Sequence, residues 1–398
     1  MAEHLPDPTP ATPDVRLLRS ITLRNILSFG PDTPPLELRA LNVLIGPNGS
    51  GKSNLLACLS LLPALATDWS TPFRAGGSTI KDWFWKGQTG QLASLEVSIE
   101  PNQIEYLVHR IDFDEIDYQA RIQRETVGIH SDDTLKPRAP HKIYLKETPS
   151  MMEIEGERQL SFFDNHLSVL AQLRDRKSYP EFARLVKAYE GLAFFRDWSF
   201  GSISPIRQPQ RADSPGNFLR DGGENLGLVL NQLRRDPEVK QQIVSLLNEL
   251  YEGIDDYETF VQAGYVELFL REGKQLIPAS RLSDGTLRFL CLLAILCHPM
   301  PPPLICLEEP ELGLHPDAIV AVGKLIKEAS LRTQLIITTH SQMLIDTLSE
   351  SPEDVVVCSK RDGATHMQRL DGEKLAMWLK EYSLGELWNS GQLGGNRW

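Results

Sequence analysis

The chain has 398 residues, 41% of them hydrophobic, which is enough for one large core or two smaller ones. Its 41 lysines and arginines against 53 aspartates and glutamates give a formal charge of -12, which argues against a surface coated in basic residues for nucleic acid but allows a local basic groove. The five cysteines form no CxxC pair, so a disulfide framework or zinc site is not indicated and they are expected to be reduced and buried.

Residues 1–15 are polar and rich in proline, without the apolar core of a signal peptide, and predict a flexible tail. The most apolar region, 289–307, approaches the length of a membrane span. His298 and the prolines after it interrupt this region, so a buried helix followed by a buried strand is expected instead. The sequence therefore predicts a cytoplasmic protein that does not enter the membrane.

Residues 41–53, LNVLIGPNGSGKS, carry the strongest pattern of the chain. An apolar run at 41–45 predicts a buried strand, and a helix is expected to open at Lys52 or Ser53. The glycine spacing between them is that of a phosphate-binding loop, whose backbone N–H groups and helix dipole receive phosphates. In such a loop Lys52 reaches the β- and γ-phosphates of ATP, and the Ser53 hydroxyl binds Mg²⁺. The residues expected to contact the nucleotide are Gly46, Pro47, Asn48, Gly49, Ser50, Gly51, Lys52, Ser53 and Asn54.

Around this loop, short strands are expected near 21–29 and at 35–39, and the helix after it is expected to carry an apolar face as far as Leu65. The following segment, 69–91, is rich in glycine and aromatic residues. We favour a surface loop whose tryptophans pack on the core. The alternative is a lid that senses the γ-phosphate, in which Gln88 or Gln91 supplies an amide to Mg²⁺ or to water.

The middle of the chain has alternating patterns and then helical ones. Antiparallel strands of a β-rich subdomain are predicted over 95–99, 104–113 and 142–145. The pattern turns helical over about 157–189, returns to a strand over 192–200 and becomes a loop over 203–223. Two helices are expected within 225–251, with Asp236 capping the second. Neither repeats nor sustained heptads occur, so no long coiled coil is expected.

After a predicted hairpin at 265–278, the stretch RLSDGTL at 281–287 leads into a very apolar helix. Ser283 is well placed to cap that helix. Its hydroxyl, the backbone N–H of Gly285 and the helix dipole would together form a second anion receptor. In ATPases of this layout one chain cannot fold both receptors onto one γ-phosphate. A second subunit is therefore expected to supply this one, so that ATP lies between two heads.

Two further strands are predicted to end in reactive side chains. The stretch 303–311, PLICLEEPE, ends in acids beside the phosphate loop, as Mg²⁺–ATP chemistry needs. Glu308 is expected to hold Mg²⁺ through water, and Glu309 to polarise the attacking water. The next strand, from residue 334, leads to His340, which could contact the γ-phosphate and that water. The alternatives are a charged turn and a structural histidine.

Four motifs in this order, GPNGSGKSN, LSDGT, LEEPELGLHP and ITTHSQ, resemble those of the ABC-type ATPase heads of the RecF/SMC/OLD clade, especially bacterial AAA-family ATPases with a short insert. The resemblance implies an α/β P-loop NTPase fold, with a mixed β-sheet core, an antiparallel β subdomain and a helical insert. It implies a head over 16–348 with its insert at about 92–225. A segment over 349–398, with an aromatic end, is expected to pack on the head.

The resemblance also assigns roles to single residues. Lys52, Glu309 and His340 would be catalytic, Ser53 and Glu308 would hold Mg²⁺, and Ser283 with Gly285 would cap the partner's ATP. Asn25 and Ser28 lie in a strand that often touches the base and ribose of the nucleotide. Two positions depart from the clade, since Glu308 stands where aspartate is usual and Leu27 where a basic residue is common.

The function implied is ATP hydrolysis by two heads that close on two ATP molecules and open afterwards. Closure would gate DNA or a separate effector, often a nuclease, in DNA repair or anti-phage defence. Basic residues that could form a groove for DNA cluster at three places, and the alternative is that these clusters are solvated faces. They are Arg16, Arg19 and Arg24; Lys136, Arg138, Lys142 and Lys146; and Arg174, Arg176 and Lys177. The alternatives are a transporter's nucleotide-binding subunit, against which LSDGT in place of LSGGQ counts, and a scaffold that binds ATP but barely hydrolyses it.

Overall fold

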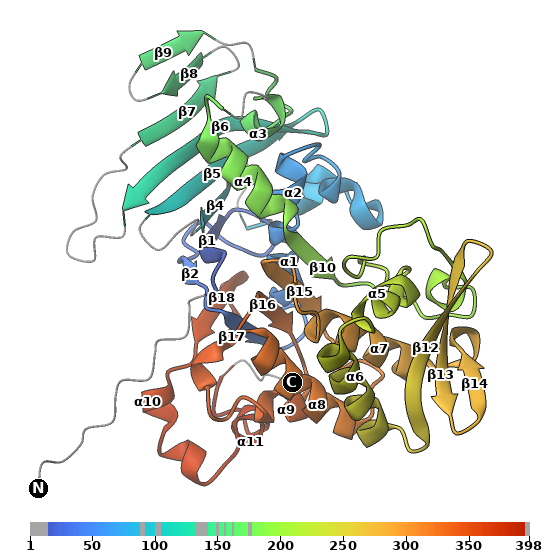
Figure 1. Cartoon of the computed structure of the whole chain (residues 1–398). Coiled ribbons are helices and arrows are strands. Elements are labelled where there is room, and N and C mark those ends of the chain that lie inside the picture. The colour runs from blue at the N-terminus through green and yellow to red at the C-terminus, as the bar shows by residue number, and fades with distance from the viewer. Residues whose placement is uncertain are drawn as a thin grey trace, which may run out of the picture.

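The computed structural model describes residues 15–87, 92–99, 105–131, 142–148, 151–154, 157–160, 163–173 and 177–394. Three sheets organise this part of the chain: one of six strands, one of eight and one of four. In Figure 1 the eight-stranded sheet lies at the top, the six-stranded sheet below it and the four-stranded sheet to the right.

The six-stranded sheet has the order β10-β15-β16-β3-β17-β18. Its strands are β10 (Leu192–Phe195), β15 (Leu304–Glu308), β16 (Gln334–Thr338), β3 (Leu41–Ile45), β17 (Val355–Arg361) and β18 (Ala364–Arg369). The first five run parallel, and only β18 is antiparallel to its neighbour. The carboxyl ends of β3, β15 and β16 therefore meet at one edge, which brings together the phosphate loop, the acids and His340.

Helices cover both faces of this sheet, because its side chains alternate between two cores. Val43 and Ile45 belong to one core and Leu44 to the other. The first core contains α5 (Leu226–Leu233), α6 (Pro237–Leu250), α7 (Asp284–Leu296) and α8 (Pro316–Ala329). The second contains α1 (Lys52–Leu59), α2 (Leu61–Leu65), α3 (Val169–Gln172) and α4 (Pro180–Glu190). The predicted cap is confirmed, since Asp236 accepts hydrogen bonds from the N–H groups of Glu238 and Val239.

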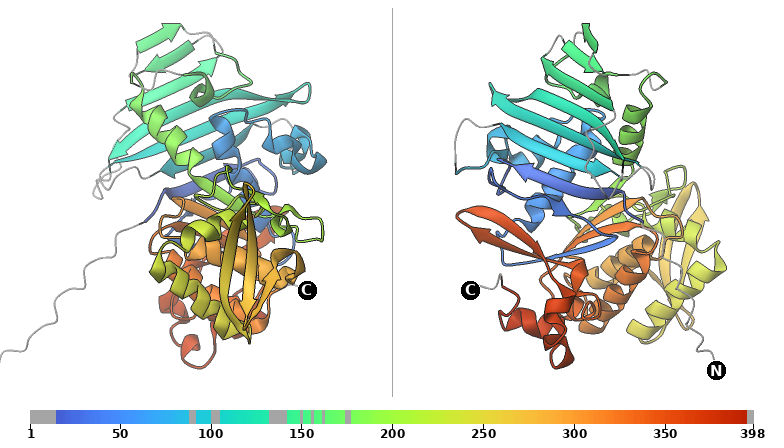
Figure 2. Two further views of the ribbon diagram at one scale, coloured as in Figure 1. Left: turned by 45° about the vertical axis from the view of Figure 1, so that its right-hand side comes forward. Right: turned by 90° about the vertical axis from the view of Figure 1, so that its left-hand side faces the viewer.

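The eight-stranded sheet has the order β2-β1-β4-β5-β6-β7-β8-β9 and is antiparallel throughout, as predicted for the β-rich subdomain. Its strands are β1 (Leu18–Arg24), β2 (Leu36–Glu37), β4 (Ala93–Ile99), β5 (Glu105–Ile116), β6 (Gln119–Ser131), β7 (Lys142–Thr148), β8 (Met151–Ile154) and β9 (Glu157–Leu160). Figure 2 shows α4 lying along one face of this sheet.

Three predicted boundaries were wrong for identifiable reasons. The strand expected near 21–29 ends at Arg24, because Asn25 and Leu27 have φ of 53° and 51°, outside the range of a strand. Residues 157–160 form β9 rather than a helix, since pairing with β8 overrides the local helical pattern. The strand expected to reach residue 200 stops at Phe195, where its pairing with β15 ends.

The four-stranded sheet comprises β11 (Gln210–Arg211), β12 (Ile254–Gln262), β13 (Tyr265–Glu272) and β14 (Gln275–Pro278). The predicted hairpin is confirmed as β13 and β14, while β12 was not predicted. Two single-turn 3-10 helices flank this sheet in the chain: η3 (Pro205–Arg207) precedes β11, and η4 (Ala279–Arg281) connects β14 to α7.

The structure of segment 69–87 agrees with the interpretation we favoured, a loop whose aromatic side chains pack on the core. It contains η1 (Pro72–Gly77) and η2 (Ile80–Trp83). Trp69, Phe73 and Trp83 are buried, with Phe73 edge-to-face against both tryptophans. Gln88 and Gln91 lie outside the described residues.

The chain after residue 348 contributes to the central sheet as well as packing on it. β17 pairs directly with β3, the strand that precedes the phosphate loop. Further on, α11 (Leu384–Asn389) packs against α9 (Gln342–Asp346) and buries Leu384 and Trp388. The Gly385 N–H donates to Asp346 Oδ1 at 2.8 Å. The aromatic end is thus docked as far as residue 394.

All five cysteines are free and buried, as predicted. Burial raises the pKa of Cys297 and of Cys358 to about 12, so these thiols remain protonated at neutral pH. Within the described ranges, no helix combines the length and apolar character that a bilayer crossing needs.

Candidate functional site

The phosphate loop joins β3 to α1, as the sequence predicted. The Lys52 ammonium folds back over this loop and donates to the carbonyl oxygens of Gly46 at 2.7 Å and Pro47 at 3.2 Å. The side chain is 5% exposed, and its burial lowers the pKa of Lys52, while nearby carboxylates, including Glu309, act in the opposite direction. A buried cation is therefore held at the loop, where phosphate oxygens would offer it negative charge.

The outer side of the loop is supported by β18, a contact that the sequence did not reveal. Thr365 Oγ1 lies 3.0 Å from the Ser50 carbonyl oxygen and 2.7 Å from Ser28 Oγ. A Cβ on Gly51 would overlap Thr365 Oγ1, and Gly51 has φ of 104°, so this position favours glycine on two grounds. Asn54 Nδ2 donates to Ser28 Oγ at 2.7 Å.

The two residues predicted to touch base and ribose are placed differently. Ser28 lies beside the phosphate loop through the bonds to Thr365 and Asn54. Asn25 is directed elsewhere, since its amide donates to the Leu92 carbonyl at 3.0 Å, and it lines a hollow together with Arg24 and Arg110. Leu27 has its backbone N–H bonded to the Trp83 carbonyl at 2.6 Å.

The acidic pair splits toward two different partners. Glu308 ends β15, and its Oε2 accepts a hydrogen bond from Arg196 Nε at 2.8 Å. Glu309 turns away because its φ is 45°, a left-handed conformation that costs of order 1–3 kcal/mol in a residue other than glycine. Its backbone N–H donates to the Thr338 carbonyl at 3.0 Å, which holds this conformation.

His340 lies beside Glu309, with 3.5 Å between Nε2 and Oε1. Partial burial and the Lys52 ammonium lower the pKa of His340 below its ordinary value, and Glu309 opposes this. The imidazole is therefore neutral at pH 7 and can both donate and accept a hydrogen bond.

Glu311 is a third acid of the site, to which the sequence analysis gave no role. It is 8% exposed, and its Oε1 accepts from Thr339 Oγ1 at 2.6 Å and from the His340 N–H at 3.0 Å. Its Oε2 is buried without a hydrogen-bond partner among the described residues. Glu311 therefore ties the loop after β15 to the end of β16 and fixes the backbone of His340.

The donor set fits a triphosphate with Mg²⁺. The Ser50 hydroxyl is buried without a hydrogen-bond partner in the described part of the chain, and nothing lies within 4 Å of the position a Cβ would take at Gly49. These features suit close approach of phosphate oxygens to the backbone. The Ser53 hydroxyl and the Glu308 carboxylate are oxygen ligands of the kind that Mg²⁺ prefers, directly or through water.

The predicted helix cap is present at the start of α7, where the second anion receptor is expected. Ser283 caps this helix, accepting from the Thr286 N–H at 3.0 Å, and it is exposed. Gly285 lies against the loop after the acids, because a Cβ there would be 2.7 Å from the Gly313 carbonyl oxygen. Across the described residues, no hydrogen bond or ion pair links Ser283 or Gly285 to the phosphate loop of the same chain.

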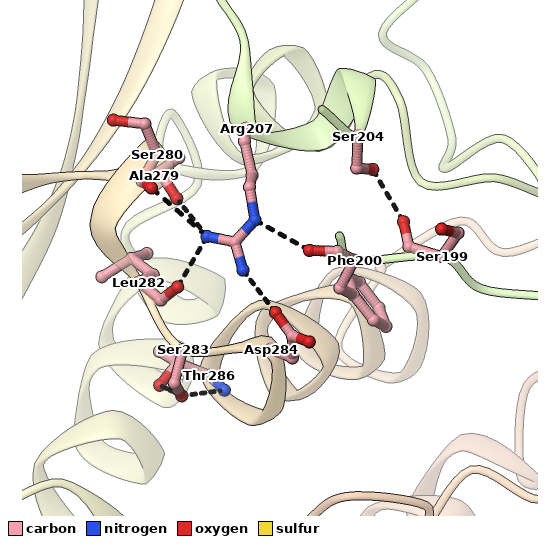
Figure 3. A network of polar contacts seen from close by, with 10 residues as sticks. All are labelled: Ser199, Phe200, Ser204, Arg207, Ala279, Ser280, Leu282, Ser283, Asp284 and Thr286. Carbon is pink, nitrogen blue, oxygen red and sulfur yellow. Dashed lines mark hydrogen bonds and ion pairs between the residues drawn. The ribbon is translucent and has the colours of Figure 1, made fainter. Parts of the chain in front are cut away.

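Arg207, at the end of η3, holds the loop that presents Ser283 (Figure 3). Its Nη1 donates to the Leu282 carbonyl at 2.6 Å and its Nε to the Phe200 carbonyl at 2.8 Å. Its Nη2 pairs with Asp284 Oδ1 at 2.5 Å. The planar guanidinium serves these acceptors at once, which a lysine could not do.

Replacing Arg207 with methionine is expected to lower the free energy of unfolding by about 2 kcal/mol or more, because the carbonyl oxygens lose their donor. Urea unfolding followed by circular dichroism measures the change. Arg211→Met is the matched control, since the ion pair of Arg211 within the described part of the chain is with the exposed Asp213, and it should leave the free energy of unfolding close to that of the wild type. Equal effects of the two changes would contradict a special role for Arg207.

Comparison with known proteins gives one family. A family model described as "AAA domain, putative AbiEii toxin, Type IV TA system" matches residues 41–346. That range begins with β3 and ends with α9, so it contains the phosphate loop, both acids, the α7 cap and His340. Among curated proteins no match is found.

Two solved structures show a similar fold. One is described as "Crystal structure of the SmcHead bound to the C-winged helix domain of ScpA", with a TM-score of 0.57, 15% identity, and coverage of 91% of this chain and 100% of that one. The other is an Smc head domain with an extended coiled coil, bound to the C-terminal domain of ScpA, from Pyrococcus furiosus. It has a TM-score of 0.54, 15% identity, and coverage of 92% of this chain and 99% of the other. At such identity the likeness concerns the fold.

Proposed function

The chain belongs to this AAA domain family and has the fold of an ABC/SMC-type P-loop ATPase head, and from this we propose that two copies close around two ATP molecules and hydrolyse them. Each ATP would lie between the phosphate loop of one copy and the Ser283-led helix of the other. Hydrolysis would let the two heads separate.

The separation of the two anion receptors within one chain supports this proposal. Lys52, Glu308, Glu309 and His340 gather at one sheet edge, linked by the contacts described above. Ser283 lies at an exposed helix start and, among the described residues, makes no hydrogen bond or ion pair to any of them. An exposed helix N-terminus with a serine hydroxyl beside it is a receptor suited to the phosphate of another molecule.

In the proposed mechanism, Lys52 and the loop N–H groups bind the phosphates, and Ser53 and Glu308 hold Mg²⁺. When bound, Mg²⁺ neutralises charge that develops on the phosphate oxygens. Glu309 would orient and polarise the attacking water, and its carboxylate lies 3.5 Å from His340, which would hydrogen-bond to it as a neutral imidazole. Glu311 keeps the His340 backbone in place.

Replacing Ser283 with arginine is expected to leave ATP binding intact while blocking ATP-driven dimerisation. The added side chain would stand in the interface, and a loss of roughly 2 kcal/mol or more corresponds to about 30-fold weaker association. Size-exclusion chromatography with light scattering, with and without ATP, measures dimerisation, and a fluorescent ATP analogue measures binding. Ser245→Arg, on the exposed side of α6, is the control. An ATP-dependent dimer of Ser283→Arg would contradict the shared site.

We further propose that head closure gates a DNA-linked process, in anti-phage defence or DNA repair, together with a separate effector protein. The resemblance to the RecF/SMC/OLD clade supports this, as does an Smc head of similar fold that is bound to a domain of ScpA. Arg16 and Arg24 line two different hollows, and the side chains of the other two basic clusters lie mostly outside the described residues. Binding of duplex DNA by the protein that requires ATP, with an affinity that falls steeply as the salt concentration rises, would support the proposal that the process is linked to DNA.

A further inference from the structure

We propose that Arg196 is a positioning residue for Glu308 and thereby sets the affinity of the ATP complex for Mg²⁺. The proposal rests on the function proposed above and adds a residue that no motif of the sequence includes. The proposal concerns position 308, where this chain has a glutamate and the clade that it resembles usually has an aspartate.

Arg196 reaches Glu308 because of the strand order. β10 and β15 are parallel neighbours, with Phe195 opposite Leu307. The next residues in the chain are Arg196, directly after the end of β10, and Glu308, the last residue of β15, and both lie at the carboxyl edge of the sheet. Their contact is 2.8 Å between Nε and Oε2, and the two side chains are 30% and 17% exposed. Charge-assisted hydrogen bonds of this kind are short and directional.

The guanidinium also faces the start of α1. Arg196 Nη2 lies 3.5 Å from the Ser53 carbonyl oxygen. Arg196 is thus between the two residues expected to hold Mg²⁺, bonded to the side chain of one and close to the backbone of the other. A residue in this position controls where the Glu308 carboxylate lies relative to the Ser53 hydroxyl.

The longer acid needs such a partner more than an aspartate would. Glutamate has one more rotatable bond, so fixing its carboxylate costs more conformational entropy. Arg196 fixes it in advance by holding Oε2, and Oε1 remains to accept a hydrogen bond from a water of Mg²⁺. The rigid planar fork of arginine suits this task better than the flexible ammonium of lysine.

Arg196 can act on Mg²⁺ binding in two opposite ways, which predict changes of opposite sign in Mg²⁺ affinity when Arg196 is removed. As a positive charge bonded to the same carboxylate, Arg196 would compete with Mg²⁺ if it had to leave before the metal could bind. Removing it would then tighten Mg²⁺ binding. Removing a positioning residue weakens Mg²⁺ binding, because the carboxylate becomes mobile.

The test is a titration of Mg²⁺ into the full chain saturated with a fluorescent ATP analogue, read by fluorescence rather than by turnover. For Arg196→Gln the apparent affinity for Mg²⁺ is expected to fall about tenfold, the lower end of the effect of removing a residue that orients a metal ligand. Arg196→Lys should recover part of this loss. Affinity for the analogue in EDTA should change less than about twofold, since Arg196 bonds to no part of the phosphate loop before Ser53.

A double-mutant cycle isolates the pair. Aspartate at position 308 is one methylene shorter and draws the carboxylate back from Arg196, so in the Glu308→Asp background Arg196→Gln is expected to change Mg²⁺ affinity less than about threefold. Arg211→Gln, which breaks the exposed pair with Asp213, is the matched control and should have no effect. Thermal unfolding without nucleotide checks that the variants fold. If Arg196→Gln does not fold, Arg196→Lys is used in its place and is expected to show a smaller loss of Mg²⁺ affinity.

Unchanged or tighter Mg²⁺ binding in Arg196→Gln, or an equal loss in the Glu308→Asp background, would overturn this inference. The proposed function fails differently. If the wild-type chain does not bind the ATP analogue at all, the ATPase proposal is wrong. If the wild type binds it with a clear dependence on Mg²⁺ that Arg196 does not influence, only the role of Arg196 is wrong.

Discussion

Lys52→Ala is expected to abolish nucleotide binding at concentrations where the wild-type chain is saturated, a loss on the order of 100-fold or more in affinity. Lys52 is a buried ammonium whose hydrogen bonds, within the described ranges, go to backbone carbonyls of its own loop. Phosphate oxygens would replace these neutral acceptors with charged ones, and removing one partner of such a buried pair costs about 2–5 kcal/mol. Fluorescence of a labelled ATP analogue gives the affinity directly.

The control for this change is Lys324→Ala, because Lys324 is exposed on α8. It should bind the analogue as the wild type does. Thermal unfolding of Lys52→Ala without nucleotide should stay close to that of the wild type, since the change removes a costly buried charge. Tight nucleotide binding by a folded Lys52→Ala protein would mean that the phosphate loop is not the nucleotide site.

Glu309→Gln is expected to slow ATP hydrolysis by about 10²- to 10⁴-fold while leaving ATP binding within a few-fold of the wild type. Glutamine keeps the size of the side chain and its contact with His340, but it is not a base. The ATP-bound dimer should therefore persist longer than in the wild type. Phosphate release measures turnover, and light scattering in the presence of ATP measures the lifetime of the dimer.

Glu350→Gln is the control, because the Glu350 side chain is 91% exposed and its ion pair in the described part of the chain is with Lys327. If the wild-type chain binds ATP but releases no phosphate, it is a scaffold that binds ATP without using it. If the wild type and Glu309→Gln both hydrolyse ATP at the same rate, a residue other than Glu309 is the base.

Much of the fold and the site could be predicted from the sequence where the information is local. The phosphate loop lies within thirteen consecutive residues, 41–53, and both helix caps, Asp236 and Ser283, act on N–H groups two or three residues away. The hairpin of β13 and β14 likewise turns within two residues. Short-range hydrogen bonds leave their requirements in neighbouring residue types.

The parts that were missed depend on residues far apart in the chain. Arg196 is 112 residues from Glu308, and Arg207 is 75 residues from the Leu282 carbonyl that it holds. A single arginine in a loop carries no pattern that reveals which distant acceptor it will meet. Glu311 was visible next to the acidic pair, but its partners, Thr339 and His340, come from the segment directly after β16. Strand β9 was mistaken for a helix because its pairing, not its local composition, decides its structure.

The hairpin of β17 and β18 has a consequence for how the protein is made. Thr365 reaches the Ser50 carbonyl across 315 residues of chain, and β17 lies beside β3 in the same sheet. During translation the phosphate loop therefore leaves the ribosome long before β17 and Thr365, which contact it or its strand in the folded protein, have been synthesised. Such distant contacts form slowly and late, so a nascent chain has no finished nucleotide pocket until nearly all of it has emerged. Premature termination before this hairpin would leave a protein that still contains every proposed catalytic side chain but lacks the strands that pack against the phosphate loop.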